Sequence, residues 1–135
     1  MTTPQTQFRT RPVGEVMTAG IVTCGKTTPL RTVATMMATH PVHAVVVFDG
    51  GDSVLPWGVV SDLDLVEAVD TDGTAGSVAA TPVVTVTVDD TLSHAAQLMR
   101  ENATSHLIVV TDEESPLPIG ILSTLDVARA FAGLD

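Results

Sequence analysis

Hydrophobic and polar positions follow the same order twice along the chain. Each half begins with a short strand pattern, and the alternation Thr85-Val86-Thr87-Val88 is typical of a half-buried strand. A helical stripe, a continuous apolar strand, a polar turn, a second strand and a second helical pattern follow. We expect these five elements at residues 21–24, about 28–37, 44–48, 57–60 and 63–69, and again at 83–88, about 90–99, 107–110, 119–122 and 125–131. The predicted order is therefore β-α-β-β-α, twice.

The two halves match without a gap. Gly14 and Gly76 lie 62 residues apart, and the same offset pairs like residues for the rest of the repeat. The period is too long for a solenoid, and only two copies exist, which suggests pseudo-two-fold packing of an α/β protein. The expected organisation is a flexible, polar N-terminal tail or docking arm at 1–12, repeat 1 at 13–70, a linker at 71–74 and repeat 2 at 75–132.

The first helix of each repeat has a recognisable start and a core-facing stripe. We expect Thr28 or Asp90 at the N-cap, and Pro29 fits the first helical position. Met37 and Met99 fall on the apolar stripe, so we interpret them as core residues and not as ligands.

One motif occurs in both repeats, at 58–65 and 120–127: Gly, two aliphatic residues, Ser, two variable positions, Asp and an aliphatic residue. It falls where a strand passes into a helix. Ser-x-x-Asp there has the form of a capping box, which is a purely structural interpretation. The same helix N-terminus has unpaired N–H groups and a positive dipole end, which suit anions and hydroxyls. The sequence leaves both interpretations open.

Composition narrows the function classes. The chain is 44% hydrophobic but only 3% aromatic, so the core must be aliphatic. A net charge of −10 disfavours nucleic acids and anionic membranes as partners. The single cysteine, Cys24, excludes an internal disulfide and aligns with Val86, so we interpret it as a small core residue. No apolar run is long enough to span a membrane and no signal peptide is visible, so we expect a cytoplasmic protein.

The sequence predicts no catalytic residues. It contains no Ser/His/Asp or Cys/His constellation and no phosphate-cradling P-loop. The four histidines lack the spacing of metal ligands, so no metal site is expected. We therefore predict that the protein is not an enzyme.

Taken together, the chain resembles a tandem pair of CBS (cystathionine-β-synthase) domains, also called a Bateman module, over about residues 13–132. The resemblance is carried by Val16-Met17-Thr18, the helices ending at Met37 and Met99, the apolar strand before Asp49, the repeated motif and above all the duplication. It implies a regulatory module with two clefts between the repeats that hold an adenosine compound such as AMP, ADP, ATP or S-adenosylmethionine. It further implies a homodimer formed through the helical faces. No cofactor is required.

The resemblance also implies which residues line each cleft. In the family, the motif Asp binds ribose hydroxyls and the Ser or Thr reaches phosphate. Cleft A would combine Thr18, Val22, His43, Ala44, Ser123, Thr124 and Asp126. Cleft B would combine Ala80, Val84, Ser105, His106, Ser61, Asp62 and Asp64.

We favour cleft A. Cleft B has Ala80 where cleft A has Thr18, and Asp62 adds a negative charge beside any phosphate. Family members often place Arg or Lys near the phosphates, whereas this chain has His43 and His106 nearby, which either bind phosphate or are ordinary polar residues before a strand. The alternative function is a ligand-free module for dimerisation or protein interaction. Neither hypothesis identifies the regulated partner.

Overall fold

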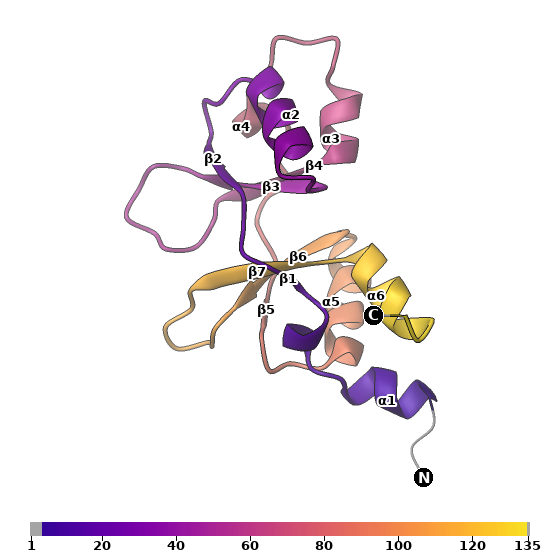
Figure 1. The fold of residues 1–135 in the computed structure, drawn as a ribbon. Helices are drawn as coiled ribbons and strands as arrows, with labels where there is room; N and C mark the ends of the chain where they lie inside the picture. The colour runs from indigo at the N-terminus through magenta and orange to yellow at the C-terminus, as the bar shows by residue number, and fades with distance from the viewer. Residues whose placement is uncertain (1–3, 135) are drawn as a thin grey trace. The chain divides into compact units, whose positions relative to one another are not determined.

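The structure is a computed structural model that describes residues 4–134, except for the side chains of residues 4–6. It is a mixed α/β fold that divides into two compact units (Figure 1). Unit 1 comprises the N-terminal segment to Gly20 together with the chain from Val84 onward, and unit 2 comprises Ile21–Val83. The units therefore do not coincide with the sequence repeats, because each takes in the segment that precedes the other repeat's first strand.

Unit 1 contains a four-stranded sheet in the order β1-β7-β6-β5. Strands β5 and β6 are parallel, and β7 runs antiparallel to both β6 and β1. The strands are β1 (Thr18–Ala19), β5 (Thr85–Thr87), β6 (His106–Val110) and β7 (Pro118–Ser123). The helices are α1 (Pro4–Thr10), the 3-10 turn η1 (Val13–Glu15), α5 (Leu92–Asn102) and α6 (Thr124–Phe131).

Unit 2 contains a three-stranded sheet in the order β2-β3-β4, with β2 parallel and β4 antiparallel to β3. An isolated antiparallel bridge joins Val59 of β4 to Ala80. The strands are β2 (Thr23–Gly25), β3 (Ala44–Phe48) and β4 (Gly58–Ser61). The helices are α2 (Leu30–Thr39), α3 (Asp62–Glu67) and α4 (Ala75–Val78). The elements β2-α2-β3-β4-α3 and β5-α5-β6-β7-α6 confirm the predicted β-α-β-β-α order in each repeat.

Each unit has its own aliphatic core, as the composition predicted. Met37 and Met99 are buried on the core-facing stripes of α2 and α5, which confirms their interpretation as core residues. Cys24 is only half-buried and packs against the unit 2 core, and this partial burial raises the pKa of its thiol despite a hydrogen bond with Thr28.

The predicted helix starts are wrong by one residue. Pro29 and Thr91 are the N-cap residues, so α2 and α5 begin at Leu30 and Leu92. The Thr91 hydroxyl accepts a hydrogen bond from the His94 N–H at 3.1 Å, which is the capping contact expected of Asp90. Asp90 instead accepts from the Thr91 N–H at 2.9 Å. The Thr28 hydroxyl accepts from the Gly25 N–H, closing the turn before α2.

Of the expected flexible tail or docking arm, residues 1–3 lie outside the described residues, and residues 4–10 are docked on unit 1. From Pro4 to Thr10 the segment forms α1, which contacts α5 and α6 (Figure 1). Phe8 supplies the physical reason: it packs against the unit 1 core and meets Phe131 edge-to-face with ring centroids 5.4 Å apart. The mostly polar composition of the segment did not indicate that Phe8 would pack against the core.

Candidate functional site: two strand-to-helix junctions

The repeated motif forms the same junction in both units. Ser123 is the N-cap of α6: its hydroxyl accepts from the Asp126 N–H at 3.1 Å, and the Asp126 carboxylate accepts from the Ser123 N–H at 2.8 Å. Ser61 and Asp64 make the same reciprocal pair at the start of α3, at 3.2 and 2.9 Å. The capping-box interpretation is therefore confirmed in both repeats.

The capping box uses only one of the two carboxylate oxygens in Asp64 and in Asp126. In each Asp the cap uses Oδ2, and among the described residues no hydrogen bond reaches Oδ1 of Asp64 or Asp126. Both side chains are only partly buried. An ionised carboxylate has about four acceptor positions, so each Asp retains the capacity to accept from vicinal hydroxyls of a sugar. The structural and ligand-binding interpretations are thus compatible.

The motif glycines allow a neighbouring backbone segment to approach the motif strand closely. Thr18 of β1 pairs with Ile121 of β7, and a Cβ on Gly120 would lie 2.6 Å from the Thr18 carbonyl oxygen. A Cβ on Gly58 would lie 3.1 Å from the carbonyl oxygen of Ala80, which bridges to Val59. The repeated motif identifies these glycines in the sequence, but only the structure gives their reason: the segment before each first strand packs onto the motif strand.

Unit 1 brings together four residues predicted for cleft A and three predicted for cleft B. Thr18 lies on β1 beside β7, the strand that ends at Ser123 and leads into Thr124 and Asp126 of α6. The three cleft B residues are Val84, whose carbonyl accepts from Ile108; Ser105, whose carbonyl accepts from Thr124 at 2.9 Å; and His106, which pairs with Ser123 across the sheet. The Ser105 hydroxyl and His106 Nδ1 are also hydrogen-bonded at 2.9 Å.

Unit 2 holds the remaining members of both predicted clefts. Ser61, Asp62 and Asp64 form the α3 junction, with Ala80 bridged to the adjacent β4. The three cleft A residues are Val22, whose carbonyl accepts from Val46; His43, just before β3; and Ala44, which is buried and pairs with Ser61. The combination of residues from different units into one cleft stays a prediction.

One contact in unit 2 was not anticipated. His43, predicted for cleft A, and Asp62, predicted for cleft B, are hydrogen-bonded through Nδ1 and Oδ2 at 2.9 Å. Their side chains are 72% and 55% exposed, so water screens the attraction between them. The imidazole nitrogen Nδ1 is nevertheless already hydrogen-bonded to a carboxylate. Adjacent strand ends carry the two residues, but their spacing of 19 positions gave no signal in the sequence.

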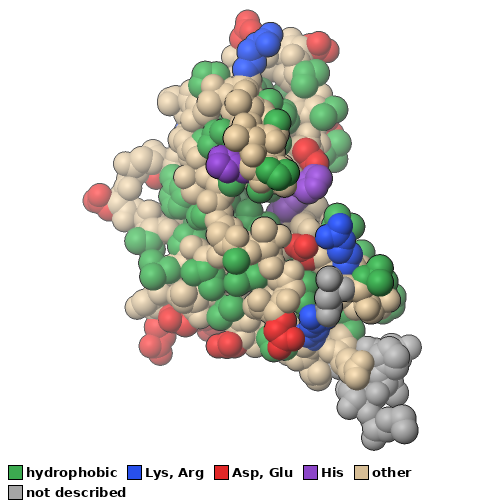
Figure 2. Space-filling view, viewed as in Figure 1, with side chains coloured by type: hydrophobic (Ala, Val, Ile, Leu, Met, Phe, Trp, Pro, Cys, Tyr) green, Lys and Arg blue, Asp and Glu red, His purple; other side chains and the backbone are tan. Residues whose placement is uncertain are grey.

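The two helix N-termini differ in charge. Asp62 and Asp64 both lie in the first turn of α3, whereas Asp126 is the only acid in the first turn of α6. Lys and Arg side chains are sparse on the face shown in Figure 2. The α6 junction is thus the less repulsive of the two for an anion.

Neither a metal centre nor a membrane span emerges from the described part of the chain. Within residues 4–134, no three His, Cys, Asp or Glu side chains are grouped so that they could hold a metal ion. No helix of that part is long and apolar enough to cross a bilayer.

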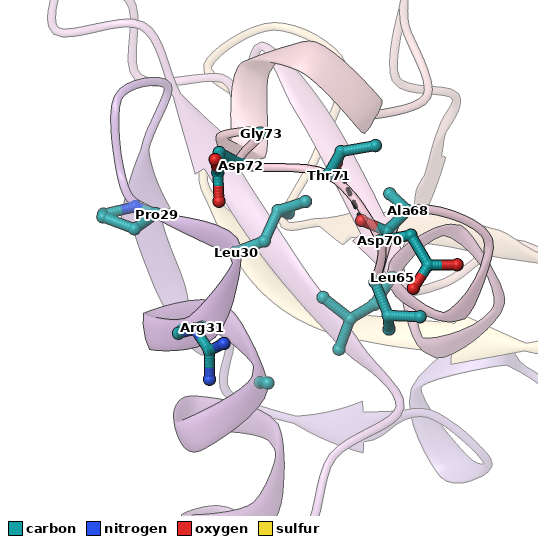
Figure 3. Close-up of a pocket in the computed structure, with 11 residues that line it drawn as sticks. Pro29, Leu30, Arg31, Leu65, Ala68, Asp70, Thr71, Asp72 and Gly73 are labelled. Carbon is teal, nitrogen blue, oxygen red and sulfur yellow. Dashed lines mark hydrogen bonds between the residues drawn. The ribbon is translucent and has the colours of Figure 1, made fainter.

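Unit 2 also contains a pocket that the sequence did not predict. It has a volume of about 500 Å³ and lies between α2, α3 and the segment 70–73 (Figure 3). We call it the α2–α3 pocket. Its lining comprises Pro29, Leu30, Arg31, Ala34, Leu65, Ala68, Val69, Asp70, Thr71, Asp72 and Gly73, and none of these was predicted as a ligand-binding residue.

Comparison with known proteins agrees with the duplicated architecture. The chain matches the family model for the CBS domain twice, over residues 13–71 and 75–133. No curated protein matches the sequence.

Three solved structures illustrate the likeness of fold. A CBS domain protein from Pyrobaculum aerophilum complexed with AMP is 28% identical, with a TM-score of 0.72 over 90% of this chain and 98% of that one. CBSX2 in complex with AMP is 26% identical, with a TM-score of 0.67 over 90% and 96%. The CBS domain pair of protein MJ0100, in complex with 5′-methylthioadenosine and S-adenosyl-L-methionine, is 20% identical, with a TM-score of 0.77 over 90% and 96%. The chain belongs to the CBS domain family and is a tandem pair of CBS domains.

Proposed function

We propose that the protein is a regulatory module that senses an adenosine compound. One observation carries the proposal: the motif Asp at each strand-to-helix junction uses one carboxylate oxygen for the cap and keeps the other available. Two of the similar structures, at 28% and 26% identity, are described in complex with AMP, which supports an adenosine ligand here. We further propose that the ligand lies between the repeats, in the clefts that the family resemblance implies.

Cleft A is the favoured site. Thr124 is neutral where Asp62 is charged, and Thr18 offers a hydroxyl where Ala80 offers none. With only 6 Lys and Arg residues against 16 acids, the chain has few cations to neutralise a triphosphate. We therefore expect AMP, ADP or a neutral adenosine compound to bind more tightly than ATP.

We propose that the module is cytoplasmic, is not an enzyme and acts as a homodimer. Exposed apolar side chains on α3 and α6 support the dimer, because burying them in an interface is favourable. They are Leu63 and Val66 on α3, and Leu125 and Phe131 on α6. A ligand then acts by favouring one arrangement of the dimer, and its effect is limited by its different affinity for the two arrangements.

A ligand-free interaction module is the second candidate. The complete capping boxes favour it, because capping alone gives Ser123 and Asp126 a structural role. In that case the same exposed helical faces would bind a second copy or a regulated protein, and the clefts would stay empty.

A thermal-shift experiment distinguishes the candidates. We expect AMP at about 100 times its Kd to stabilise the folded protein by about 2.7 kcal/mol, raising the Tm. The decisive variant is Asp126→Asn. The amide oxygen can still accept from the Ser123 N–H and so keep the capping box, while the second carboxylate oxygen, which would accept from the ribose, is lost. The variant should keep nearly the Tm of the unliganded protein but lose most of the rise with AMP.

Asp64→Asn is the matched control, since it makes the same change at the other junction and should leave most of the rise intact. An equal loss in both variants would contradict the preference for cleft A. If AMP, ADP, ATP, S-adenosylmethionine and NAD at millimolar concentration all leave the Tm unchanged, the interaction module is the correct function.

A further inference from the structure

In each unit, an equivalent segment of the chain bonds to the start of the first helix of a pair, which is α5 with α6 in unit 1 and α2 with α3 in unit 2. Pro12 bridges to Thr91 in unit 1 as Thr74 bridges to Pro29 in unit 2. The Leu92 N–H donates to the Arg11 carbonyl at 2.9 Å, and the Leu30 N–H donates to the Gly73 carbonyl at 3.2 Å. The residues just upstream, 8–11 and 70–73, therefore stand in equivalent positions beside α5–α6 and α2–α3.

In unit 1 a helix covers this position. Helix α1 packs on α5 and α6, and Phe8 packs against the core to which Leu92 and Ala130 belong. Its ring also contacts Phe131 edge-to-face. This surface of unit 1 is thus contacted by one aromatic side chain from a short helix that carries Arg9 in its last turn.

In unit 2 the equivalent position is the α2–α3 pocket. Leu30 lines it from α2, and Ala68 and Val69 line it just after α3. At the offset of 62 these residues match Leu92 and Ala130, which belong to the core that Phe8 packs against, and Phe131, which contacts the Phe8 ring. The segment 70–73 follows α3 after a two-residue turn and forms the edge of the pocket without filling it (Figure 3). The residues that an aromatic side chain contacts in unit 1 therefore have counterparts that border an open pocket in unit 2.

The charge at the pocket suits a basic occupant. Asp70 and Asp72 stand at its edge, and Arg31 is the only Lys or Arg in its lining. Val69 is 66% exposed, which extends the apolar surface beyond the pocket. An apolar floor beside two carboxylates is complementary to a side chain such as Phe with a neighbouring Arg or Lys.

We propose that the α2–α3 pocket is a docking site for a short amphipathic helix of a partner protein. That helix places one aromatic side chain in the pocket and a basic residue against Asp70 and Asp72, as the Phe8-Arg9 pair of α1 would. None of the residues proposed to bind adenosine compounds lines the pocket, so this inference does not rest on the proposed function.

The chain itself supplies the probe. A labelled peptide with the sequence of residues 1–11 is titrated into the whole protein, with anisotropy as the readout and methyl NMR to locate the site. We expect saturable binding with shifts at Leu65 and Val69, and an affinity lower by about tenfold or more for the peptide with Phe8→Ala. High salt should also weaken binding, because Asp70 and Asp72 are near the surface. Absence of binding at millimolar peptide, or shifts confined to Leu92 and Val127 of unit 1, would overturn the proposal.

Two matched pairs of protein variants test the site. Ala34→Leu fills the pocket and should weaken peptide binding about tenfold, whereas Ala38→Leu, at an exposed position one turn further along the same helix and outside the pocket lining, should not. Asp70→Asn with Asp72→Asn should weaken binding a few-fold at low salt, and Asp49→Asn with Asp52→Asn should not. Unchanged binding to both pocket variants would refute the site.

Two further measurements separate this proposal from the others. If Ala34→Leu changes the oligomeric mass of the protein, the pocket belongs to an interface with a second copy, and the partner-helix proposal is overturned. The rise in Tm with AMP should be the same for Ala34→Leu and the unchanged protein. A failure of the docking site is thereby distinguished from a failure of adenosine sensing.

Discussion

At the residue scale, Gly120 is the clearest example of a position where the neighbouring atoms leave no room for a side chain. It pairs with Ala19 of β1, and the Met17 sulfur would lie 2.8 Å from a Cβ at this position. Gly58 faces the same restriction from Ala79 and Thr81. The glycines are needed for close approach of a neighbouring strand and not for an unusual backbone angle.

This packing predicts the effect of Gly120→Ala. The methyl group would meet the backbone of Thr18, which cannot move without breaking the pairing of β1 with β7. We expect a loss of about 1–3 kcal/mol in the free energy of unfolding, measured by urea denaturation. Gly25→Ala is the control, because nothing but the Thr28 hydroxyl at 4.0 Å lies near its added Cβ. Equal stability of the two variants would contradict this account.

At the scale of elements, the most informative helix is α1. Its seven residues are too few to form a stable helix alone, so its packing on α5 and α6 must stabilise it. Phe8 provides the apolar contact. The equivalent segment of unit 2 has Asp70 at the position of Phe8 and forms no helix.

Phe8→Ala should therefore detach α1 without unfolding the rest of unit 1. We expect a loss of about 1–3 kcal/mol, because Phe8 is only partly buried and also loses its contact with Phe131. Faster tryptic cleavage after Arg9 would report the detachment, since proteases cut transiently opened segments, whereas the Arg11-Pro12 bond resists trypsin. Gln7→Ala, at an exposed position of the same helix, should leave the cleavage rate unchanged.

At the scale of the whole molecule, neither compact unit is built from one repeat alone. Unit 1 combines repeat 2 from Val84 onward with the chain up to Gly20, and Val13 is fully buried in its core. Strand β1 also covers one edge of β7. The duplicated sequence therefore does not correspond to two independent folding units.

The predicted consequence is that a fragment of residues 75–135 will not fold as the whole chain does. It lacks β1, Val13 and Phe8, leaving an uncovered strand edge and a core without its N-terminal contribution. We expect no cooperative transition when its circular dichroism is followed on heating. A permuted chain that joins residues 84–135 to residues 1–20 through a flexible linker should melt cooperatively. A cooperative melt of the 75–135 fragment near the Tm of the whole chain would show that the exchanged segment is dispensable.

The sequence by itself determined the duplicated β-α-β-β-α order, the aliphatic cores and the capping box at each motif. These features depend on contacts between residues a few positions apart, such as Ser123 with Asp126, or on the periodicity of one face, such as the stripe ending at Met99. The same periodicity could not fix the N-cap at Thr91, because Asp90 and Thr91 are both good capping residues and only the backbone geometry chooses between them.

Only the tertiary structure decided which segments lie together. The pairing of Thr18 with Ile121, the hydrogen bond from His43 to Asp62 and the open α2–α3 pocket join residues that are distant in the sequence. Such contacts leave no local pattern, since they arise when separate elements pack and their side chains compete for the same space. The motif Asp was therefore identifiable from the sequence, whereas the strand beside it and the pocket between α2 and α3 were not.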